Sequence, residues 1–396
     1  MKYYYYHGES DSLWSSNLDY DHEGNPDGCT DSITKERALQ LQKQLGWSEI
    51  PNYINRKLIK NVMKKTDILE ALTIVKPGLS NKEIIEQASS FAFINGNIVT
   101  YNDEISIQHP IEGLNFEGAI KAEILYGLLS KVKSEDIEMK VNGNELSVVA
   151  GRTKAGIAFQ EKVVLPLDEI TEKTKWKSLP KDFCKFMSFA AGACSGDMST
   201  PVLTCIHVTK EGYFLSSDNY KILQVKLSGP MPVESFLIPA NSSMIVAKLN
   251  PTKISMGPGW VHFKTAAGTI ISCRIFEDKY PDIVKVLETK GTKVSFPSSL
   301  KSTLDRAGVF SKRDHIFDEM VELTLTDKKL LVKATSDQGW FEETLKMGYE
   351  GVPITLFITP YLLKDILAQT SDCIIAKNKL KFESPDWAYV SALKNI

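Results

Sequence analysis

The sequence predicts an α+β protein in which one two-layer unit, helices on antiparallel sheet, occurs three times after an N-terminal extension. Two observations predict this fold class. Amphipathic helical segments and alternating strand segments recur in one order, and turns that carry an aspartate recur at a near-constant period. The aspartates Asp103, Asp218 and Asp337 lie 115 and 119 residues apart. Because aspartate favours turns everywhere, the prediction depends on order and period together.

Each repeat is expected to begin with an amphipathic helix, at residues 67–72, 181–194 and 298–310. A strand pair that carries the aspartate follows, at residues 98–107, 214–223 and 331–337. Second helices are expected at residues 121–132, 241–249 and 360–368. A hairpin closes each repeat, as at residues 137–149. The alternation along these strands favours antiparallel sheets with one face covered by helices.

The first 56 residues are predicted to be an acidic extension of unknown role. A helix is expected in it at residues 35–45, ended by Gly46 and capped by Thr30, Asp31 or Ser32. The repeats that follow are predicted to form three domains, at residues 57–165, 176–288 and 289–396.

The charge of the chain is unevenly distributed. Its formal net charge is −2, but residues 1–32 carry −6, so the remaining chain carries +4. A surplus of four positive charges permits nucleic-acid binding and does not require it, because binding depends on where the charges lie.

The composition indicates a cytoplasmic protein. No apolar run approaches the roughly 18 residues of a membrane span, and the N-terminus lacks the apolar core of a secretory signal. The six cysteines contain no Cys-x-x-Cys pair, which favours reduced thiols over disulfides or a zinc site; they are Cys29, Cys184, Cys194, Cys205, Cys273 and Cys373.

The sequence does not indicate an enzyme, a cofactor or a metal centre. It lacks phosphate-binding, dinucleotide-binding, metalloprotease and serine-hydrolase motifs. A calcium-like loop begins at Asp19, but the position of its last acidic ligand is Thr30. Residues 151–154 could contact phosphate and fit a basic hairpin loop equally well. The six histidines lack ligand spacing; they are His7, His22, His109, His207, His262 and His315.

Several short motifs along residues 57–396 resemble, in order and spacing, the β subunit of bacterial DNA polymerase III, the ring-shaped DNA sliding clamp, in a phage-type form. The matching segments are residues 67–72 with 75–78, 201–203, 217–222, 236–240, 279–282, 349–351 and 388–390. The chain departs from the family at Asn219-Tyr220-Lys221 and at its last five residues, and the extension has no counterpart.

The resemblance implies a DNA-clamp type of fold and a non-enzymatic processivity factor. Because rings of this family close with six domains, three per chain imply a head-to-tail homodimer around duplex DNA, joining the first domain of one chain to the third of the other. Basic side chains on the helices, and Lys82 in the loop after the first helix, would face the phosphates, and each is alternatively a solvated surface charge. The helix residues are Lys131, Lys133, Lys181, Lys185, Lys301, Arg306 and Lys364.

The resemblance also implies a cleft between the second and third domains that captures a short linear peptide of a replicative DNA polymerase or clamp loader. Its residues carry over as Leu203, Ser217, Asn219, Tyr220, Lys221, Ile222, Pro239, Met244, Val390 and Ala392. Some of these, such as Leu203, Ile222 and Val390, are alternatively ordinary core residues. The departures at Tyr220, Lys221 and Ala392 predict a shifted peptide preference.

Two other readings stay open. The chain could be a clamp-fold scaffold or regulator that binds a host or virion partner through residues 1–56 without encircling DNA. It could also be a clamp that has lost ring closure and acts as a monomeric regulator of a host polymerase. In each reading the expected location is cytoplasmic, and it is the host cytoplasm if the protein is phage-encoded.

Overall fold

The computed structural model describes residues 3–7, 12–16, 31–44, 62–114, 116–170 and 175–394. The chain forms two compact units, one from residues 1–70 and 111–162 and the other from residues 71–110 and 163–396. The three-domain boundaries expected from the sequence divide the chain by repeat instead, and they stay a prediction.

The acidic extension contains strands that the sequence does not predict. Its elements are β1 (Tyr3–His7), β2 (Ser12–Ser16), β3 (Asp31–Ile33) and α1 (Lys35–Gln44), and the strands pair antiparallel in the order β2-β1-β3. The cap of α1 is Thr34, whose hydroxyl oxygen accepts a hydrogen bond from the Arg37 amide at 3.3 Å. The expected caps at Thr30, Asp31 or Ser32 are therefore wrong, and the end expected at Gly46 lies outside the described residues.

The rest of the first unit is one antiparallel sheet with helices. Its strands lie in the order β8-β11-β10-β9-β4. Its elements are β4 (Val62–Lys64), the start of α2 (Lys65–Val75), β8 (Gly118–Lys121), α3 (Ala122–Lys131), β9 (Asp136–Asn142), β10 (Glu145–Ala150) and β11 (Thr153–Gln160).

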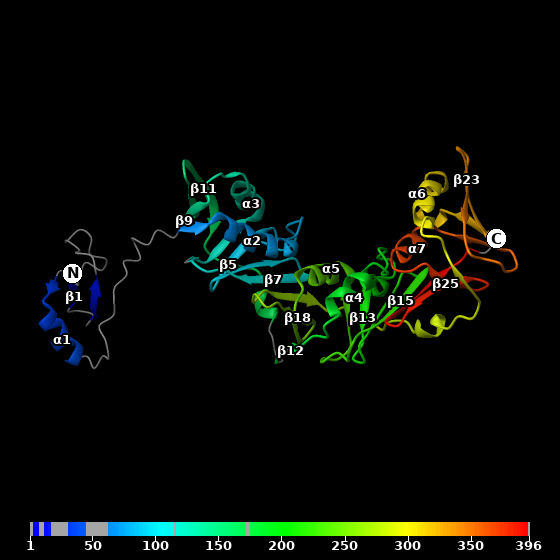
Figure 1. The fold of residues 1–396 in the computed structure, drawn as a ribbon. Coiled ribbons are helices and arrows are strands. Elements are labelled where there is room, and N and C mark those ends of the chain that lie inside the picture. The colour runs from blue at the N-terminus through cyan, green and yellow to red at the C-terminus, as the bar shows by residue number, and fades with distance from the viewer. Residues whose placement is uncertain are drawn as a thin grey trace. The chain divides into compact units, whose positions relative to one another are not determined.

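The second unit holds the rest of the first repeat and the two repeats that follow (Figure 1). Its first elements are η1 (Lys76–Gly78), β5 (Ser90–Ile94), β6 (Asn97–Tyr101), β7 (Ile105–Pro110), η2 (Leu167–Glu169), β12 (Lys177–Ser178), α4 (Phe183–Ala191), η3 (Pro201–Thr204), β13 (Cys205–Val208), β14 (Tyr213–Ser217), β15 (Lys221–Lys226), β16 (Phe236–Pro239), α5 (Ala240–Leu249), β17 (Lys253–Gly257), β18 (Trp260–Lys264) and β19 (Ile270–Arg274). The last are η4 (Val284–Leu287), β20 (Thr292–Ser295), α6 (Leu300–Ser311), η5 (Ile316–Asp318), β21 (Val321–Thr326), β22 (Lys329–Ser336), β23 (Gly339–Lys346), β24 (Ile354–Ile358), α7 (Tyr361–Lys364), η6 (Ile366–Ala368), β25 (Asp372–Ile375), β26 (Lys379–Ser384) and β27 (Trp387–Ala392).

The strand order confirms the threefold repeat and the predicted α+β class. In the second and third repeats, the first strand joins the last three, in the orders β12-β17-β18-β19 and β20-β25-β26-β27. The middle strands have the orders β16-β13-β14-β15 and β24-β21-β22-β23. The order β4-β9-β10-β11 in the first unit and β5-β6-β7 in the second follow the same two patterns.

Helix α4 links the two sheet layers of the second repeat. Its Phe183 is 1% exposed. The ring centroid lies 5.3 Å from that of Phe214 on β14 and 5.7 Å from that of Phe263 on β18. Helix α5 lies beside α4 (Figure 1). One aromatic side chain therefore packs against both groups of strands, as expected for helices that cover a sheet face.

The turns that define the sequence period differ by one residue between repeats. The Asn102 side-chain oxygen accepts hydrogen bonds from the amides two and three residues ahead, at 3.2 and 3.0 Å. Asp218 does the same at 2.9 and 2.8 Å. The next residues, Asp103 and Asn219, both have positive φ, +75° and +73°. Asn102 is therefore equivalent to Asp218, whereas Asp337 lies in a two-residue hairpin turn.

Among the described residues, no helix is both long and apolar enough to cross a membrane. The described part of the chain also contains no group of three or more His, Cys, Asp or Glu side chains that could hold a metal ion.

His262 predicts an acid-dependent loss of stability. Its side chain on β18 is fully buried and lies 2.8 Å from the Ser272 hydroxyl. Burial lowers its pKa to about 4, so between about pH 6.5 and 4 only the unfolded chain binds this proton. Stability from this group is complete above about pH 6.5 and decreases as the pH falls. We expect a loss of about 2 kcal/mol at pH 5, measured by urea unfolding.

A His262→Gln variant is the control for this prediction, because it removes the titration. Its unfolding free energy should depend less on pH between 7 and 5, whatever its stability at pH 7. An unchanged pH dependence in the variant would assign the acid sensitivity to other groups.

Candidate functional site

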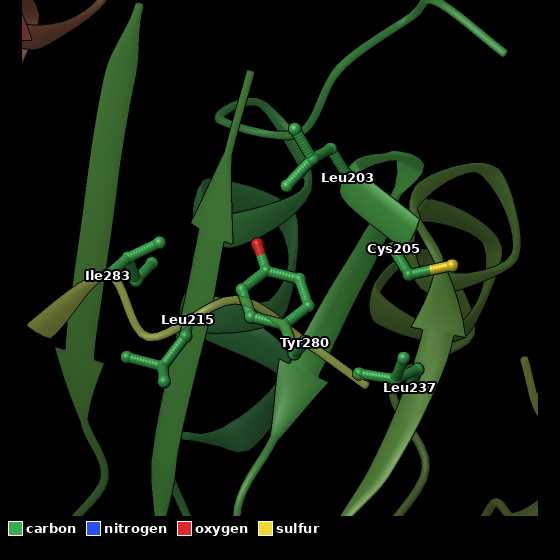
Figure 2. Close-up of a cluster of buried hydrophobic side chains, with 6 residues drawn as sticks. All are labelled: Leu203, Cys205, Leu215, Leu237, Tyr280 and Ile283. Atoms are coloured by element: carbon green, nitrogen blue, oxygen red, sulfur yellow. The ribbon is translucent and has the colours of Figure 1, made fainter. Parts of the chain in front are cut away.

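A buried apolar cluster underlies the predicted cleft. It comprises Leu203, Cys205, Leu215, Leu237, Tyr280 and Ile283, and Val202, Ile222 and Phe276 pack against it. Figure 2 shows the Tyr280 ring among these side chains, with its hydroxyl directed toward Leu203. Burial raises the pKa of the Cys205 thiol to about 11, so this cysteine is a neutral apolar group at neutral pH. Leu203, only 4% exposed, is part of this core.

The strand junction between the second and third repeats joins several predicted residues. Ile222 on β15 is the cross-strand partner of Val390 on β27. Two residues further along β27, the Ala392 amide donates a hydrogen bond to the Tyr220 carbonyl at 2.8 Å. Val390 is buried, whereas Ala392 is exposed. The junction therefore brings residues of both repeats to one edge of the apolar cluster.

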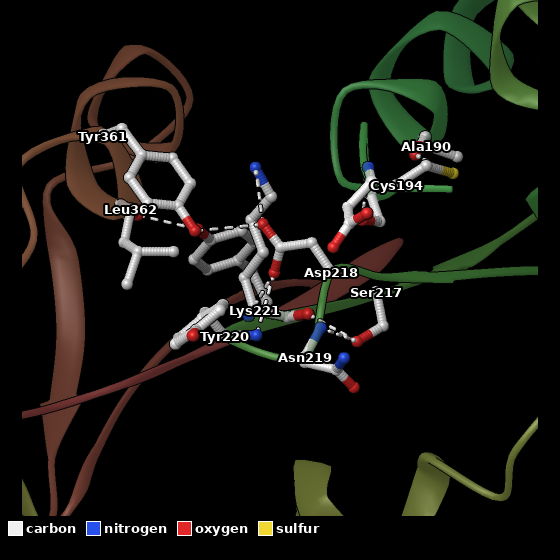
Figure 3. Close-up of polar contacts among 12 residues, drawn as sticks. Ala190, Cys194, Ser217, Asp218, Asn219, Tyr220, Lys221, Tyr361 and Leu362 are labelled. Carbon is white, nitrogen blue, oxygen red and sulfur yellow. Dashed lines mark hydrogen bonds and ion pairs between the residues drawn. The ribbon is translucent and has the colours of Figure 1, made fainter. Parts of the chain in front are cut away.

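A polar network fixes the turn before β15 (Figure 3). Ser217 donates from its hydroxyl to the Lys221 carbonyl at 2.8 Å and accepts from the Asn219 amide at 3.2 Å. The Lys221 ammonium lies 3.6 Å from the Asp218 carboxylate, and both side chains are at most 8% exposed. The Tyr361 hydroxyl donates a hydrogen bond to the same carboxylate oxygen of Asp218, Oδ2, at 3.1 Å. A buried ion pair thus ties the second repeat to α7 of the third.

Tyr361 is held as a neutral donor in this network. Burial, followed by the negative charge of Asp218, raises its pKa. The Lys221 ammonium lies 5.0 Å from the centre of its ring, within the range of a cation–π contact. Lys221 therefore has two partners and contributes no free positive charge to the cleft.

Three aromatic rings close one side of this junction. The Tyr220 ring stacks on Phe317, with centroids 4.1 Å apart and an interplanar angle of 20°. Phe317 meets Tyr361 edge-on at 5.6 Å. Tyr220 remains 43% exposed. Sequence reasoning missed Phe317 and Tyr361, since neither belongs to a motif that carries the resemblance.

Two predicted cleft residues lie away from the strand junction. Pro239 ends β16, pairs with Cys205 of the apolar cluster, and lines a cavity together with Arg274 and Met198. Met244 lies on α5 and is 51% exposed, and the described contacts do not join it to the strand junction. Tyr280 lies in the same buried cluster as Leu203. The sequence identified Tyr280 only as part of the Lys279-Tyr280-Pro281-Asp282 turn motif and did not assign it to the cleft.

The predicted DNA-facing cations fall into two groups. Six are exposed and form no ion pair within the described chain: Lys82, Lys131, Lys133, Lys181, Lys185 and Lys301. Arg306 pairs with Glu343 at 2.6 Å, and Lys364 pairs with Asp305 at 2.9 Å. Partners within the chain therefore offset the charge of these two.

Lys181 lies outside the helix on which the sequence places it. Helix α4 begins at Phe183, so Lys181 and Lys185 are not one turn apart on one helix face. The apolar face is as expected, since Phe183, Phe186 and Met187 are buried. Lys185 stays exposed, with its ammonium 4.8 Å from the Phe186 ring centre.

Comparison with known proteins identifies the fold. No protein-family model and no curated protein matched the sequence. A DNA polymerase III β chain from Streptococcus pneumoniae matches with 17% identity and a TM-score of 0.75, over 84% of this chain and 98% of that one. The β subunit from Pseudomonas aeruginosa has 16% identity and a TM-score of 0.72, over 84% and 99%. The sliding clamp from Bacillus subtilis has 16% identity and a TM-score of 0.71, over 85% and 98%.

The chain therefore has the DNA sliding-clamp fold. Within this class it resembles the β subunit of bacterial DNA polymerase III, as the sequence motifs predict. At these identities the similarity establishes the fold alone, and the activity and partners are a separate question.

Proposed function

We propose that this protein is a DNA sliding clamp, a non-enzymatic processivity factor. Two copies would close head to tail around duplex DNA, and a peptide cleft would tether a replicative DNA polymerase and receive a clamp loader. One observation carries the proposal. The chain forms the same type of strand junction twice, and it contains one more pair of strands of the same kind, β23 and β11, that do not pair with each other within one chain.

Two junctions have the same construction. The last middle strand of one repeat pairs antiparallel with the final strand of the next, as β7 with β19 and β15 with β27. The Arg274 amide donates to the Glu104 carbonyl at 2.8 Å, just as the Ala392 amide donates to that of Tyr220. These contacts hold successive repeats in one arrangement.

A third junction of this kind lacks its partner within one chain. Strand β23 corresponds to β7 and β15, and in the described chain it pairs only with β22. Strand β11 corresponds to β19 and β27, and β8 pairs with it only at Phe159 and Gln160. Unpaired strand edges are sites for pairing with another chain. Pairing β23 with β11 of a second copy would complete the set with a closed dimer.

The placement of the cations supports a DNA role without sequence readout. The six exposed, unpaired cations named above could contact phosphates, which requires no base-specific geometry. The Arg306–Glu343 and Lys364–Asp305 pairs would lower the positive charge on the third repeat. This balance suits weak, mobile contact with a duplex rather than a tight static complex.

The junction between the second and third repeats supports the tethering role. An apolar cluster, half-buried Ile222 and exposed Ala392 lie beside hydrogen-bonding groups of the Ser217–Lys221 turn. An apolar surface with a few polar groups at its rim suits an extended peptide anchored by one or two side chains.

The exposed Trp340 provides a test of ring closure. It lies on β23 and is 71% exposed in one chain, so a charge there should leave the fold intact. Trp340→Asp is expected to weaken dimerisation at least tenfold, because aromatic anchors dominate interface energies. Sedimentation equilibrium at micromolar concentration measures the effect.

Val352→Asp is the matched control, since Val352 is 81% exposed and lies outside the strands. It should sediment like the unsubstituted protein. A mass of one chain for the unsubstituted protein would overturn the closed-dimer proposal and favour a monomeric scaffold or regulator.

A further inference from the structure

A cavity of about 390 Å³ lies beside the β7–β19 junction, at the opposite end of the second repeat's middle strands from the β15–β27 junction, and it shares Cys205 with the apolar cluster. Its walls come from the turn before β7, the loop after α4, the start of α5 and the end of β19. The residues that line the cavity include Glu104, Met198, Pro239, Ala240, Arg274 and Phe276. A cavity of this size, with apolar walls and few charged groups at its rim, has the properties of a ligand site.

The repeat provides an internal reference for this cavity. At the end of β19, three successive amides donate hydrogen bonds to carbonyls of other segments: Arg274 to Glu104, Ile275 to Gly259 and Phe276 to Leu237. At the end of β27, three successive amides do the same: Ala392 to Tyr220, Leu393 to Asn378 and Lys394 to Phe357. All six distances are 2.8–3.1 Å. The helices that follow, α5 and α7, both begin directly after a proline. By this register Glu104 is equivalent to Tyr220, and Ala240 to Tyr361.

The equivalent place at the β15–β27 junction is filled. There the rings of Tyr220, Phe317 and Tyr361 pack on one another, and Phe317 comes from the segment after α6. At the β7–β19 junction the corresponding positions hold a glutamate, an alanine and the loop around Ser195–Met198. At two positions of the repeated framework, Glu104 and Ala240, the aromatic side chain of the other junction is therefore replaced, and the cavity lies there.

We propose that this cavity binds an aromatic side chain presented by a segment of a partner protein. The packing at the other junction shows that the repeated framework accommodates such rings. Met198, which is 68% exposed on the rim, is a flexible apolar side chain that can adapt to a ring. The inference depends on the cavity and the repeat, and not on the proposed clamp function.

The rim favours a segment with a positive charge next to its aromatic residue. Glu104 is exposed and forms no ion pair in the described part of the chain. The Arg274 guanidinium is already engaged, since it lies 2.7 Å from Asp103 and 4.8 Å from the Trp260 ring. The free charge at the rim is therefore negative.

Methionine-methyl NMR tests the proposal, with Met198 as the reporter at the rim of the cavity and Met244 as the reporter outside it. The probe is acetyl-Lys-Phe-Ala-amide. We expect the Met198 signal to shift with a dissociation constant on the order of 1 mM, as for a small ligand. The Met244 signal should stay unchanged, and acetyl-Lys-Leu-Ala-amide should bind at least about fivefold more weakly.

Two substitutions that copy the filled junction should abolish the shift, Ala240→Tyr and Glu104→Tyr. Glu104 is exposed, so its variant should fold even if the other does not. Val309→Tyr adds the same ring at a position that is 72% exposed on α6 and should leave binding unchanged. A Met198 signal that ignores the phenylalanine peptide, or that shifts equally in Glu104→Tyr, would overturn the proposal. Equal affinity for N-acetylphenylalanine amide would contradict a protein segment as the ligand.

Discussion

Asp218→Ala is expected to destabilise the protein by about 3–5 kcal/mol, as for other buried ion pairs that lose one partner. The substitution leaves the Lys221 ammonium buried beside the Tyr361 ring without its carboxylate. It also removes the acceptor for the amides of Tyr220 and Lys221. Urea unfolding at pH 7 measures the loss.

Asp103→Ala is the matched comparison at the other junction. Asp103 pairs with Arg274 at 2.7 Å, but both side chains are more than 40% exposed. An exposed pair contributes roughly 0–1 kcal/mol. Asp218→Asn, which keeps an acceptor oxygen and loses the charge, should lie between the two. Equal losses for Asp218→Ala and Asp103→Ala would contradict the role assigned to burial.

Phe183→Ala is expected to cost about 3–5 kcal/mol, the range for deleting a fully buried aromatic side chain. Phe183 packs against Phe214 and Phe263, which lie on different groups of strands. Its loss leaves a cavity where the helix layer meets both. Thermal or urea unfolding reports the change.

Val309→Ala is the control for this substitution, because Val309 is also helical and is 72% exposed. Its effect should stay within about 0.5 kcal/mol. A loss of less than about 1 kcal/mol in Phe183→Ala would mean that the repeat does not depend on α4 for its core.

The helices and the repeat could be predicted from the sequence because local patterns encode them. The expected helix at residues 241–249 corresponds to α5 (Ala240–Leu249), and that at residues 298–310 to α6 (Leu300–Ser311). The strands of the extension could not be predicted, since a segment such as Tyr3–His7 has no alternation between apolar and polar residues.

The aspartate period was only approximately right for a physical reason. Asparagine and aspartate accept the same turn hydrogen bonds, so Asn102 performs in the first repeat what Asp218 performs in the second. Residue identity alone cannot show this one-position offset. Hydrogen-bond register is needed to find it.

The candidate cleft was predicted in part. The turn from Ser217 to Ile222 is local, and its residues lie together as the motif implies. Phe317 comes from a segment without hydrophobic period, about a hundred residues away, and only tertiary packing brings it to Tyr220. Contacts of this kind leave no signal in a single sequence.

Retention on DNA tests the central claim most directly. The protein would be loaded onto nicked circular duplex with a bacterial clamp loader and separated from free protein, before and after the circle is cut once. A closed ring that slides should remain on the circle and leave the linear molecule through its ends. Equal retention on both forms would contradict encirclement and leave the clamp fold without the clamp function.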